Sequence, residues 1–339
     1  MAEKLLLDVH NLKVSFPTEK GIVSAVEGVS FTVSSGETLG IVGESGCGKS
    51  VTAESILRLF DEKSVEYGGE VRYAGRNLLE LSERNMEKLR GNEISMIFQD
   101  PMSSLNPVHS IGRQIAENVR LHRGASKREA RKVAIDMLRQ VGIPSPETRV
   151  DDYPHELSGG MRQRVMIAMA LACGPKLLIA DEPTTALDVT IQAQILGLID
   201  KLKKESEMGV ILITHDLAVV AEVCDRVAVM YLGQVIEETD TDTLFFGARH
   251  PYTLGLMRSV PKIEGERQDK LHVIEGTVPS LHQIPVGCRF APRCPYADDQ
   301  CRSEMPQLQS TVEGHRVRCW HIDRVAEKEG NAHDAVAIG

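Results

Sequence analysis

Apolar and polar residues alternate along two early segments of the chain. Residues 5–16 and 23–33 alternate with a period of two, which is the pattern of a half-buried β-strand. Residues 39–42 form a short apolar run, which is typical of a buried strand in a parallel sheet. A glycine-rich turn follows, and then a helical pattern over residues 49–60. The beginning of the chain therefore predicts two strands and a strand–turn–helix unit.

The middle of the chain is richer in helix formers, roughly over residues 100–159. An amphipathic helix is predicted over 128–141, because its apolar residues recur at helical spacing. Strands and helices then alternate, which indicates an α/β fold. The strands are predicted at 176–180, 210–214, 227–232 and 234–238, and the helices at 191–204 and 217–223.

The composition changes after about residue 247. Prolines at 251, 261, 279, 285, 292 and 295 divide the chain into short pieces, and four of the seven cysteines lie in the same region. We expect a small Cys-rich C-terminal domain over 251–326, held by a metal site. The Gly-, Ala- and His-rich residues 327–339 are expected to be a disordered tail.

Charge and hydropathy exclude some functions. The net charge of −9 argues against a general nucleic-acid binder, which would usually carry an excess of Lys and Arg. No stretch approaches the roughly 18 apolar residues that a membrane-spanning helix needs. The charged N-terminus, with only three leucines after it, does not resemble a signal peptide. We therefore expect a cytoplasmic protein that reaches a membrane only through a partner.

Residues 43–50 fit the P-loop pattern G-x-x-x-x-G-K-[ST] without a mismatch. Its glycines let backbone N–H groups curl round phosphates, and the helix after it directs its positive end at them. Lys49 is expected to reach the β- and γ-phosphates of ATP, and the Ser50 hydroxyl to bind Mg²⁺. The predicted phosphate-binding residues are Gly43, Glu44, Ser45, Gly46, Cys47, Gly48, Lys49, Ser50 and Val51.

A second motif, KLLIADE at 176–182, is an apolar strand that ends in two acids. A carboxylate at the end of a buried strand beside a P-loop is well placed to hold Mg²⁺, and we assign that role to Asp181. Glu182 is predicted to be the catalytic residue that polarises the attacking water. Taken alone, both acids would be ordinary residues at a strand end.

The segment LSGGMRQR at 157–164 distinguishes between P-loop proteins. It resembles the signature of ABC ATPases, which binds the γ-phosphate of the ATP held by the opposite subunit. Ser158 can cap the helix that follows, while Gly159 and Gly160 permit close approach of the backbone. Kinases, GTPases and helicases share the P-loop but not this segment.

Other ABC elements follow in the expected order. Gln99 resembles the Q-loop residue that senses Mg²⁺ and contacts the membrane subunit, and Asp188 belongs to a D-loop-like Ala-Leu-Asp. His215 resembles the switch histidine that contacts the γ-phosphate, and Phe16 is a candidate for stacking on adenine. Residues 1–250 thus resemble an ABC nucleotide-binding domain. That family has a RecA-like core, an antiparallel β subdomain and a helical subdomain, here about 100–159.

Several strings are similar to the ATPases of dipeptide and oligopeptide importers. They lie at 98–107, 153–157, 186–192, 250–253 and 285–294. The resemblance implies two transmembrane permease subunits, a paralogous ATPase as heterodimer partner and an extracytoplasmic substrate-binding protein. It places the chain on the cytoplasmic face of the inner membrane. The same family includes transporters of nickel and glutathione, so the cargo stays open.

The late cysteines follow the spacing C-x5-C-x6-C-x17-C, at Cys288, Cys294, Cys301 and Cys319. The absence of C-x-x-C pairs fits poorly with a usual structural zinc site. Four thiolates can equally hold a 4Fe-4S cluster, which some members of the importer family carry. We favour the cluster and keep zinc, free buried thiols and a disulfide as alternatives. We expect no chemistry at Cys47 and core positions for Cys173 and Cys224.

Two other functions compete with a transport ATPase. Soluble ABC ATPases that act on nucleic acid or ribosomes usually hold two cassettes or a long coiled coil, whereas this chain has one cassette and no heptad run. A catalytically silent regulatory subunit would not need the intact set Lys49, Asp181, Glu182 and His215. The sequence therefore favours an ATP-hydrolysing transport subunit.

Overall fold

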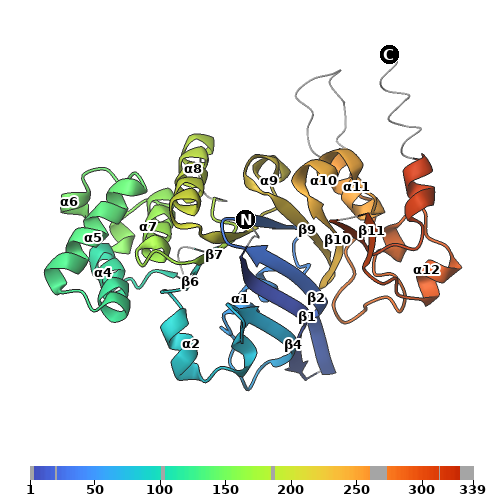
Figure 1. Ribbon diagram of the computed structural model, residues 1–339, viewed down its shortest axis with the longest axis horizontal. Helices are drawn as coiled ribbons and strands as arrows, with labels where there is room; N and C mark the ends of the chain where they lie inside the picture. Colours follow the sequence, from blue (N-terminus) through green and yellow to red (C-terminus); the bar gives the residue numbers. More distant parts are fainter. Residues whose placement is uncertain are drawn as a thin grey trace, which may run out of the picture.

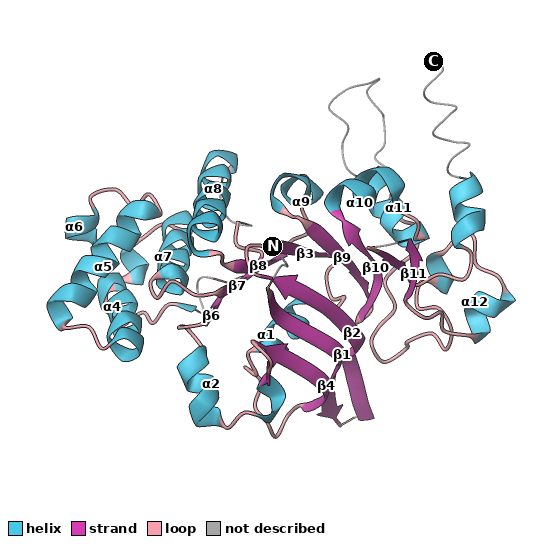
Figure 2. Cartoon of the chain, in the orientation of Figure 1, coloured by secondary structure: helices cyan, strands magenta, loops and turns pink. Residues whose placement is uncertain are grey.

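The computed structural model describes residues 4–19, 21–100, 104–184, 188–259, 273–312 and 314–328. Figures 1 and 2 show two β-sheets, with a group of helices at one end of the molecule and the C-terminal segments at the other. The smaller sheet has four strands and the larger sheet has eight.

The smaller sheet is antiparallel, in the order β2-β1-β4-β5. It confirms the two strands expected at the beginning of the chain, whereas the sequence patterns did not reveal β4. Leu12 and Val14 face the core from β1, as their alternation predicts, and Val9 joins them because the strand shifts register at the left-handed Asn11. The bounds are β1 (Leu5–Thr18), β2 (Gly21–Ser34), β4 (Glu66–Tyr73) and β5 (Arg76–Asn77).

The larger sheet has the order β11-β12-β10-β9-β3-β8-β7-β6. Strands β9, β3, β8, β7 and β6 are parallel to one another, and β10, β12 and β11 continue the sheet from β9 in antiparallel pairing. Every residue of β3, β7 and β8 is buried, as expected for strands covered on both faces. The bounds are β3 (Thr38–Val42), β6 (Ile94–Ile97), β7 (Leu177–Asp181), β8 (Gly209–Ile213), β9 (Arg226–Tyr231), β10 (Gln234–Asp240), β11 (Gln309–Val312) and β12 (His315–Val317).

The helices confirm most of the predicted segments. Helices α4, α5, α6 and α7 lie together at one end of the molecule (Figure 1), and a capping box of Ser126 and Glu129 begins α5. Helix α1 ends earlier than predicted, because Arg58 adopts a left-handed φ of 50°. The bounds are α1 (Lys49–Ile56), α2 (Glu83–Leu89), α4 (Ile111–Arg123), α5 (Lys127–Gln140), α6 (Pro146–Arg149), α7 (Gly159–Leu171), α8 (Val189–Ser206), α9 (Leu217–Val223), α10 (Thr241–Gly247), α11 (Pro251–Arg258) and α12 (Asp299–Ser303).

The C-terminal residues extend the large sheet. Strand β12 pairs with β10, and β11 pairs with β12. The sequence patterns did not anticipate this pairing, and a domain boundary near residue 250 stays a prediction. Residues 322–328 are helical, which includes the first two residues of the expected disordered tail; residues 329–339 lie outside the described part of the chain. No helix in the described ranges has the length and apolar character needed to cross a membrane.

A buried carboxylate joins this C-terminal region to β10. Glu237 is fully buried and accepts hydrogen bonds from the backbone N–H groups of Arg249 (2.7 Å) and His250 (3.0 Å). Its Oε1 also lies 2.8 Å from Nε2 of His315 on the neighbouring β12. A buried charge is tolerated only when it is well paired, so these partners hold α11 and β12 against β10.

We predict that Glu237→Gln lowers the free energy of unfolding by about 2–4 kcal/mol, because the amide leaves buried donors without an acceptor. Urea denaturation followed by circular dichroism measures the change. Glu205→Gln is the control, since that side chain is 58% exposed, and we expect a change below about 0.5 kcal/mol there. Equal unfolding midpoints for the two variants would contradict the role given to Glu237.

Candidate nucleotide-binding site

The predicted catalytic residues follow neighbouring parallel strands. Ile41 of β3 is level with Ile213 of β8, and Ile213 is level with Asp181 of β7. On the far side of β7, Ile97 of β6 is level with Ala180. The P-loop, His215, Glu182 and Gln99 therefore leave the sheet along one edge. Ligands of open α/β sheets bind at this carboxyl edge of the strands.

The P-loop forms a tight turn between β3 and α1. Gly43 and Gly48 have φ angles of 152° and 99°, which L side chains rarely adopt. A Cβ on Gly43 would lie 2.2 Å from the carbonyl oxygen of Met230, and one on Gly48 would lie 2.8 Å from that of Ala25. The Nζ of Lys49 donates to the carbonyl oxygens of Gly43 (2.7 Å) and Glu44 (3.1 Å). The loop thus curls around its own lysine, as the motif requires.

The other predicted phosphate-binding residues differ in exposure. Ser45 and Gly46 form the exposed tip of the loop, while Cys47 is buried. Burial raises the pKa of the Cys47 thiol, which agrees with our assigning it no chemistry. Phe16 packs edge-on against Phe60, with ring centroids 5.1 Å apart.

Asp181 ends β7 and is 3% exposed. Burial raises the pKa of this carboxyl, while its hydrogen bond with Ser50 and the charge of Lys49 lower it. Its Oδ1 is buried without a hydrogen-bond partner among the described residues. An unpaired carboxylate oxygen beside a hydroxyl is a suitable donor set for Mg²⁺, which prefers oxygen ligands. Two of the residues predicted to hold the ion, Ser50 and Asp181, are therefore brought together.

Glu182 contacts both other residues predicted to be catalytic. Its Oε2 accepts a hydrogen bond from Nε2 of Gln99 at 3.2 Å, and its Oε1 lies 3.2 Å from Nδ1 of His215. The backbone of Glu182 is left-handed, with φ 48°, and its N–H donates to the carbonyl of Ile213 at 2.9 Å. Such strain on a non-glycine residue clusters at functional sites. The three side chains thus form one connected polar group beside Asp181.

The signature residues lie at the start of a helix. Ser158 caps α7, and its Oγ accepts from the N–H of Met161 at 3.4 Å, which confirms the predicted cap. Farther along α7, Gln163 donates to the carbonyl of Pro183 and so ties the helix to the segment after Glu182. Gly159 has no atom within 4 Å of the position that a Cβ would occupy, so open space surrounds it.

Asp188 takes a similar position at the start of α8. Its Oδ1 accepts from the N–H of Ile191 at 3.0 Å. The next residue, Val189, is 83% exposed. The remaining D-loop positions, Ala186 and Leu187, lie outside the described residues.

Two residues at the nucleotide site escaped the sequence analysis. The Oη of Tyr252 accepts from the N–H of Glu44 at 2.8 Å, and the guanidinium of Arg293 lies 2.6 and 3.1 Å from the Glu44 carboxylate oxygens. Both belong to strings that resemble the importer family. No spacing or periodicity connected those strings to the P-loop, because the contacts span more than 200 positions of the chain.

The four late cysteines line one pocket, together with His250, Phe290 and His321. All four are free thiols in the structure. Burial raises the pKa of each thiol, to about 11 for Cys294 and about 12 for Cys319. Cys173 and Cys224 are buried in the core, as predicted. The fold therefore brings together the four cysteines that the sequence analysis singled out.

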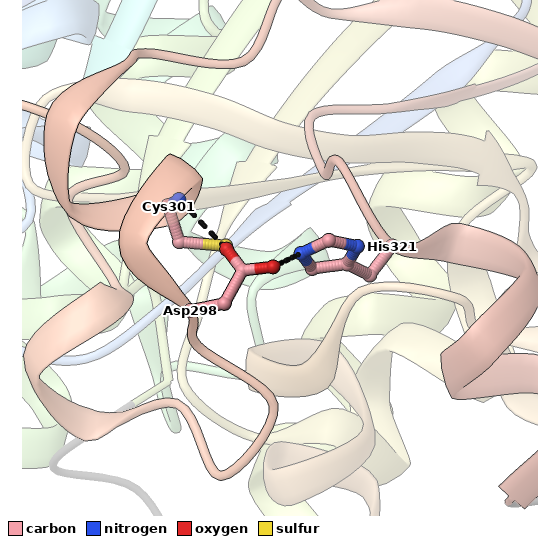
Figure 3. Close-up of side chains that lie close together, drawn as sticks. All are labelled: Asp298, Cys301 and His321. Carbon is pink, nitrogen blue, oxygen red and sulfur yellow. Dashed lines mark hydrogen bonds and ion pairs between the residues drawn. The ribbon is translucent and has the colours of Figure 1, made fainter.

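Figure 3 shows a closer group at the edge of this pocket. The Asp298 carboxylate accepts from the N–H of Cys301 at 3.0 Å and lies 2.7 Å from Nε2 of His321. The ligand atoms of these three residues all lie within 4.8 Å of one another, close enough to share one metal ion. Within the described part of the chain, no three of the four cysteine sulfurs lie that close together.

Two family models match the chain. The model described as ABC transporter matches residues 26–185, which contain the P-loop, Gln99 and the signature. The model described as the oligopeptide/dipeptide transporter C-terminal region matches residues 236–301, which contain Tyr252 and three of the four late cysteines.

Similar proteins match nearly the whole length of the chain. A probable peptide ABC transporter ATP-binding protein of Sinorhizobium fredii is 58% identical, over 95% of this chain and 96% of that protein. The oligopeptide transport ATP-binding protein AppD of Bacillus subtilis is 51% identical, over 96% of this chain and 98% of that protein.

Solved structures agree on the fold. A dimeric ATP-binding cassette in a post-hydrolysis state with ADP and Pi is 29% identical and matches with a TM-score of 0.64, over 70% of this chain and 99% of that one. The chain cbiO1 of Clostridium perfringens, part of the ABC transporter complex cbiONQ, matches with a TM-score of 0.60 at 29% identity, over 72% of this chain and 92% of that one. With the P-loop, Asp181, Glu182, Gln99 and His215 on one edge of the sheet, the chain belongs to the ABC transporter family as an ATP-binding subunit with the oligopeptide/dipeptide transporter C-terminal region.

Proposed function

We propose that the chain binds ATP with Mg²⁺ at the P-loop and hydrolyses it to power the import of peptides. The observation that carries the proposal is the contact of Glu182 with both Gln99 and His215, beside the Ser50–Asp181 pair. Phosphoryl transfer depends mainly on positioning and on compensation of charge. A connected group of this kind supplies the positioning, while Lys49 and Mg²⁺ would compensate the phosphate charge.

Each residue takes a distinct role in this proposal. Backbone N–H groups of residues 43–51 and the ammonium of Lys49 bind the phosphates, while Phe16 stacks on adenine. Ser50, Asp181 and Gln99 hold Mg²⁺, which offsets phosphate charge when bound. The Glu182 carboxylate orients and polarises the attacking water, and His215 donates to the γ-phosphate.

A second ATPase subunit completes the site. We propose that Ser158, Gly159, Gly160 and Asp188 act on the nucleotide of a paralogous partner. The open space around Gly159 and the exposure of Val189 support a surface that receives another molecule. The dimeric state of a solved relative supports the same arrangement.

Peptides are the proposed cargo, since the relatives are named as peptide or oligopeptide transport proteins. The chain then works on the cytoplasmic face of the inner membrane with two permease subunits and an extracytoplasmic binding protein. Nickel and glutathione are the alternatives. Labelled peptide, nickel and glutathione offered to vesicles that hold the complete transporter and ATP distinguish them.

We propose further that Cys288, Cys294, Cys301 and Cys319 hold a 4Fe-4S cluster within a C-terminal unit of residues 251–326. Sulfurs around one tetrahedral zinc would lie about 3.8 Å apart, given a Zn–S bond of about 2.3 Å. No three of these sulfurs come within 4.8 Å of one another in the described residues, although all four line one pocket. Thiolates suit both metals, so the preference for a cluster rests on the resemblance of this segment to the importer C-terminal region. Zinc stays the alternative, with Asp298 and His321 as further ligands.

Glu182→Gln is expected to lower the ATPase rate of the assembled transporter by about 100-fold or more, because the amide cannot polarise water as a carboxylate does. Nucleotide affinity should stay near that of the wild type, and ATP-driven peptide uptake into vesicles should fall with the rate. Lys49→Ala is the comparison and should lose affinity as well. A Glu182→Gln complex that hydrolyses ATP at the normal rate would overturn the assignment.

Anaerobic purification should give a brown protein with equal amounts of iron and sulfide, if the four thiols hold the cluster. Cys294→Ser should remove the visible absorption and the iron, whereas Cys173→Ser should leave both unchanged, because Cys173 is buried in the core and does not line the pocket of the late cysteines. Stoichiometric zinc, or no metal, in the wild-type protein would refute the cluster and leave the ATPase assignment intact.

A further inference from the structure

Glu44, the second residue of the P-loop, is held by the C-terminal region. We propose that Arg293 is a positioning residue for ATP binding: through the Glu44 carboxylate it fixes the turn that carries Lys49. The C-terminal region would then complete the nucleotide site of its own chain. This inference rests on the proposed nucleotide site.

Every polar group of Glu44 has a partner. Its N–H donates to Oη of Tyr252 at 2.8 Å, and its carbonyl oxygen accepts from Nζ of Lys49 at 3.1 Å and from the N–H of Cys47 at 3.3 Å. Its carboxylate receives the two arms of the Arg293 guanidinium, at 2.6 and 3.1 Å. Two of these partners, Tyr252 and Arg293, come from the C-terminal region. The path from Arg293 to the phosphate-binding lysine therefore passes through a single residue.

Arg293 is itself held in place. Its side chain is 3% exposed, and it donates from Nε to the carbonyl of Glu275 at 3.0 Å and from Nη2 to that of Ile274 at 3.2 Å. The guanidinium carbon also lies 5.9 Å from the ring centres of Tyr231 and Phe290. A buried, fixed guanidinium with two parallel contacts to a carboxylate imposes direction as well as charge. Glu44 therefore meets a rigid partner rather than a mobile surface arginine.

A purely structural role for this ion pair would have a different signature. If Arg293 only fastened the C-terminal region, its removal would lower the melting temperature and leave nucleotide affinity unchanged. If it positions the P-loop, its loss frees the Glu44 carbonyl and Lys49 to move, and the affinity for phosphates falls. Arg302 provides a matched control, because it lies in the same region but its side chain is 62% exposed.

Titration calorimetry measures the ADP affinity of the full-length protein. The protein is used as purified, with whatever metal its cysteine site retains. Arg293→Ala and Glu44→Ala should each weaken ADP binding about tenfold. The double variant should be no weaker than either single one, since both changes break the same contact. Arg293→Lys should restore part of the affinity, and Arg302→Ala should bind like the wild type.

Affinities of both Arg293→Ala and Glu44→Ala within twofold of the wild type would overturn the inference, provided that Lys49→Ala still abolishes binding. Should Arg293→Ala fail to fold, Glu44→Ala decides alone, because it removes the contact from the P-loop side. A double variant weakened by the product of the single effects would also overturn it. A wild-type protein that binds no ADP would instead refute the proposed nucleotide site.

Discussion

The parallel pairing of β3, β8, β7 and β6 is the constraint on which the nucleotide site depends. These strands come from distant parts of the chain, yet their register sets Ile41, Ile213 and Asp181 level with one another. Because side chains in a strand alternate between faces, a slip of one residue would turn every buried side chain to the opposite face. Because both faces of β3, β7 and β8 are packed, a slip would place each side chain in a space shaped by different neighbours. Hydrophobic packing of these strands thereby fixes the positions of the polar residues at their carboxyl ends, although those residues add little to the packing themselves.

The C-terminal region depends on the same sheet from its other side. Strand β9 follows β3 in the order, β10 pairs with β9, and β12 pairs with β10. The buried Glu237 carboxylate sits on that antiparallel pairing and orders the start of α11, from which Tyr252 reaches Glu44. The cysteine pocket and the P-loop are thus connected through one continuous sheet, which explains how residues more than 200 positions apart meet.

Local patterns were sufficient to predict most of the fold and the centre of the site. The alternation of β1 and β2 and the apolar runs of β3, β7 and β8 depend on side chains that are neighbours in sequence, so a short window reveals them. The P-loop and Asp181–Glu182 carry their chemistry in contiguous residues. The strand β4 was missed because Gly68 and Gly69 interrupt its pattern, and α1 was extended too far because nothing local marks the left-handed Arg58. The contacts of Arg293 and Tyr252 with Glu44 depend on tertiary packing, which no window of sequence contains.

The cysteine pocket shows how burial and charge together constrain what it can bind. Each thiol has its pKa raised by burial, and nearby thiolates would raise the pKa of Cys294 and Cys319 further. Burial therefore favours the neutral form of these thiols, which can be buried without a charge. Thiolates are the form that binds metal, so a metal must displace these protons and supply positive charge in return. Soft, thiophilic metals meet that requirement better than the hard Mg²⁺ ion of the nucleotide site, where oxygen ligands stand ready. The proposed cluster and the proposed Mg²⁺ site would therefore differ in ligand type within one chain, with thiolates at the first and oxygen ligands at the second.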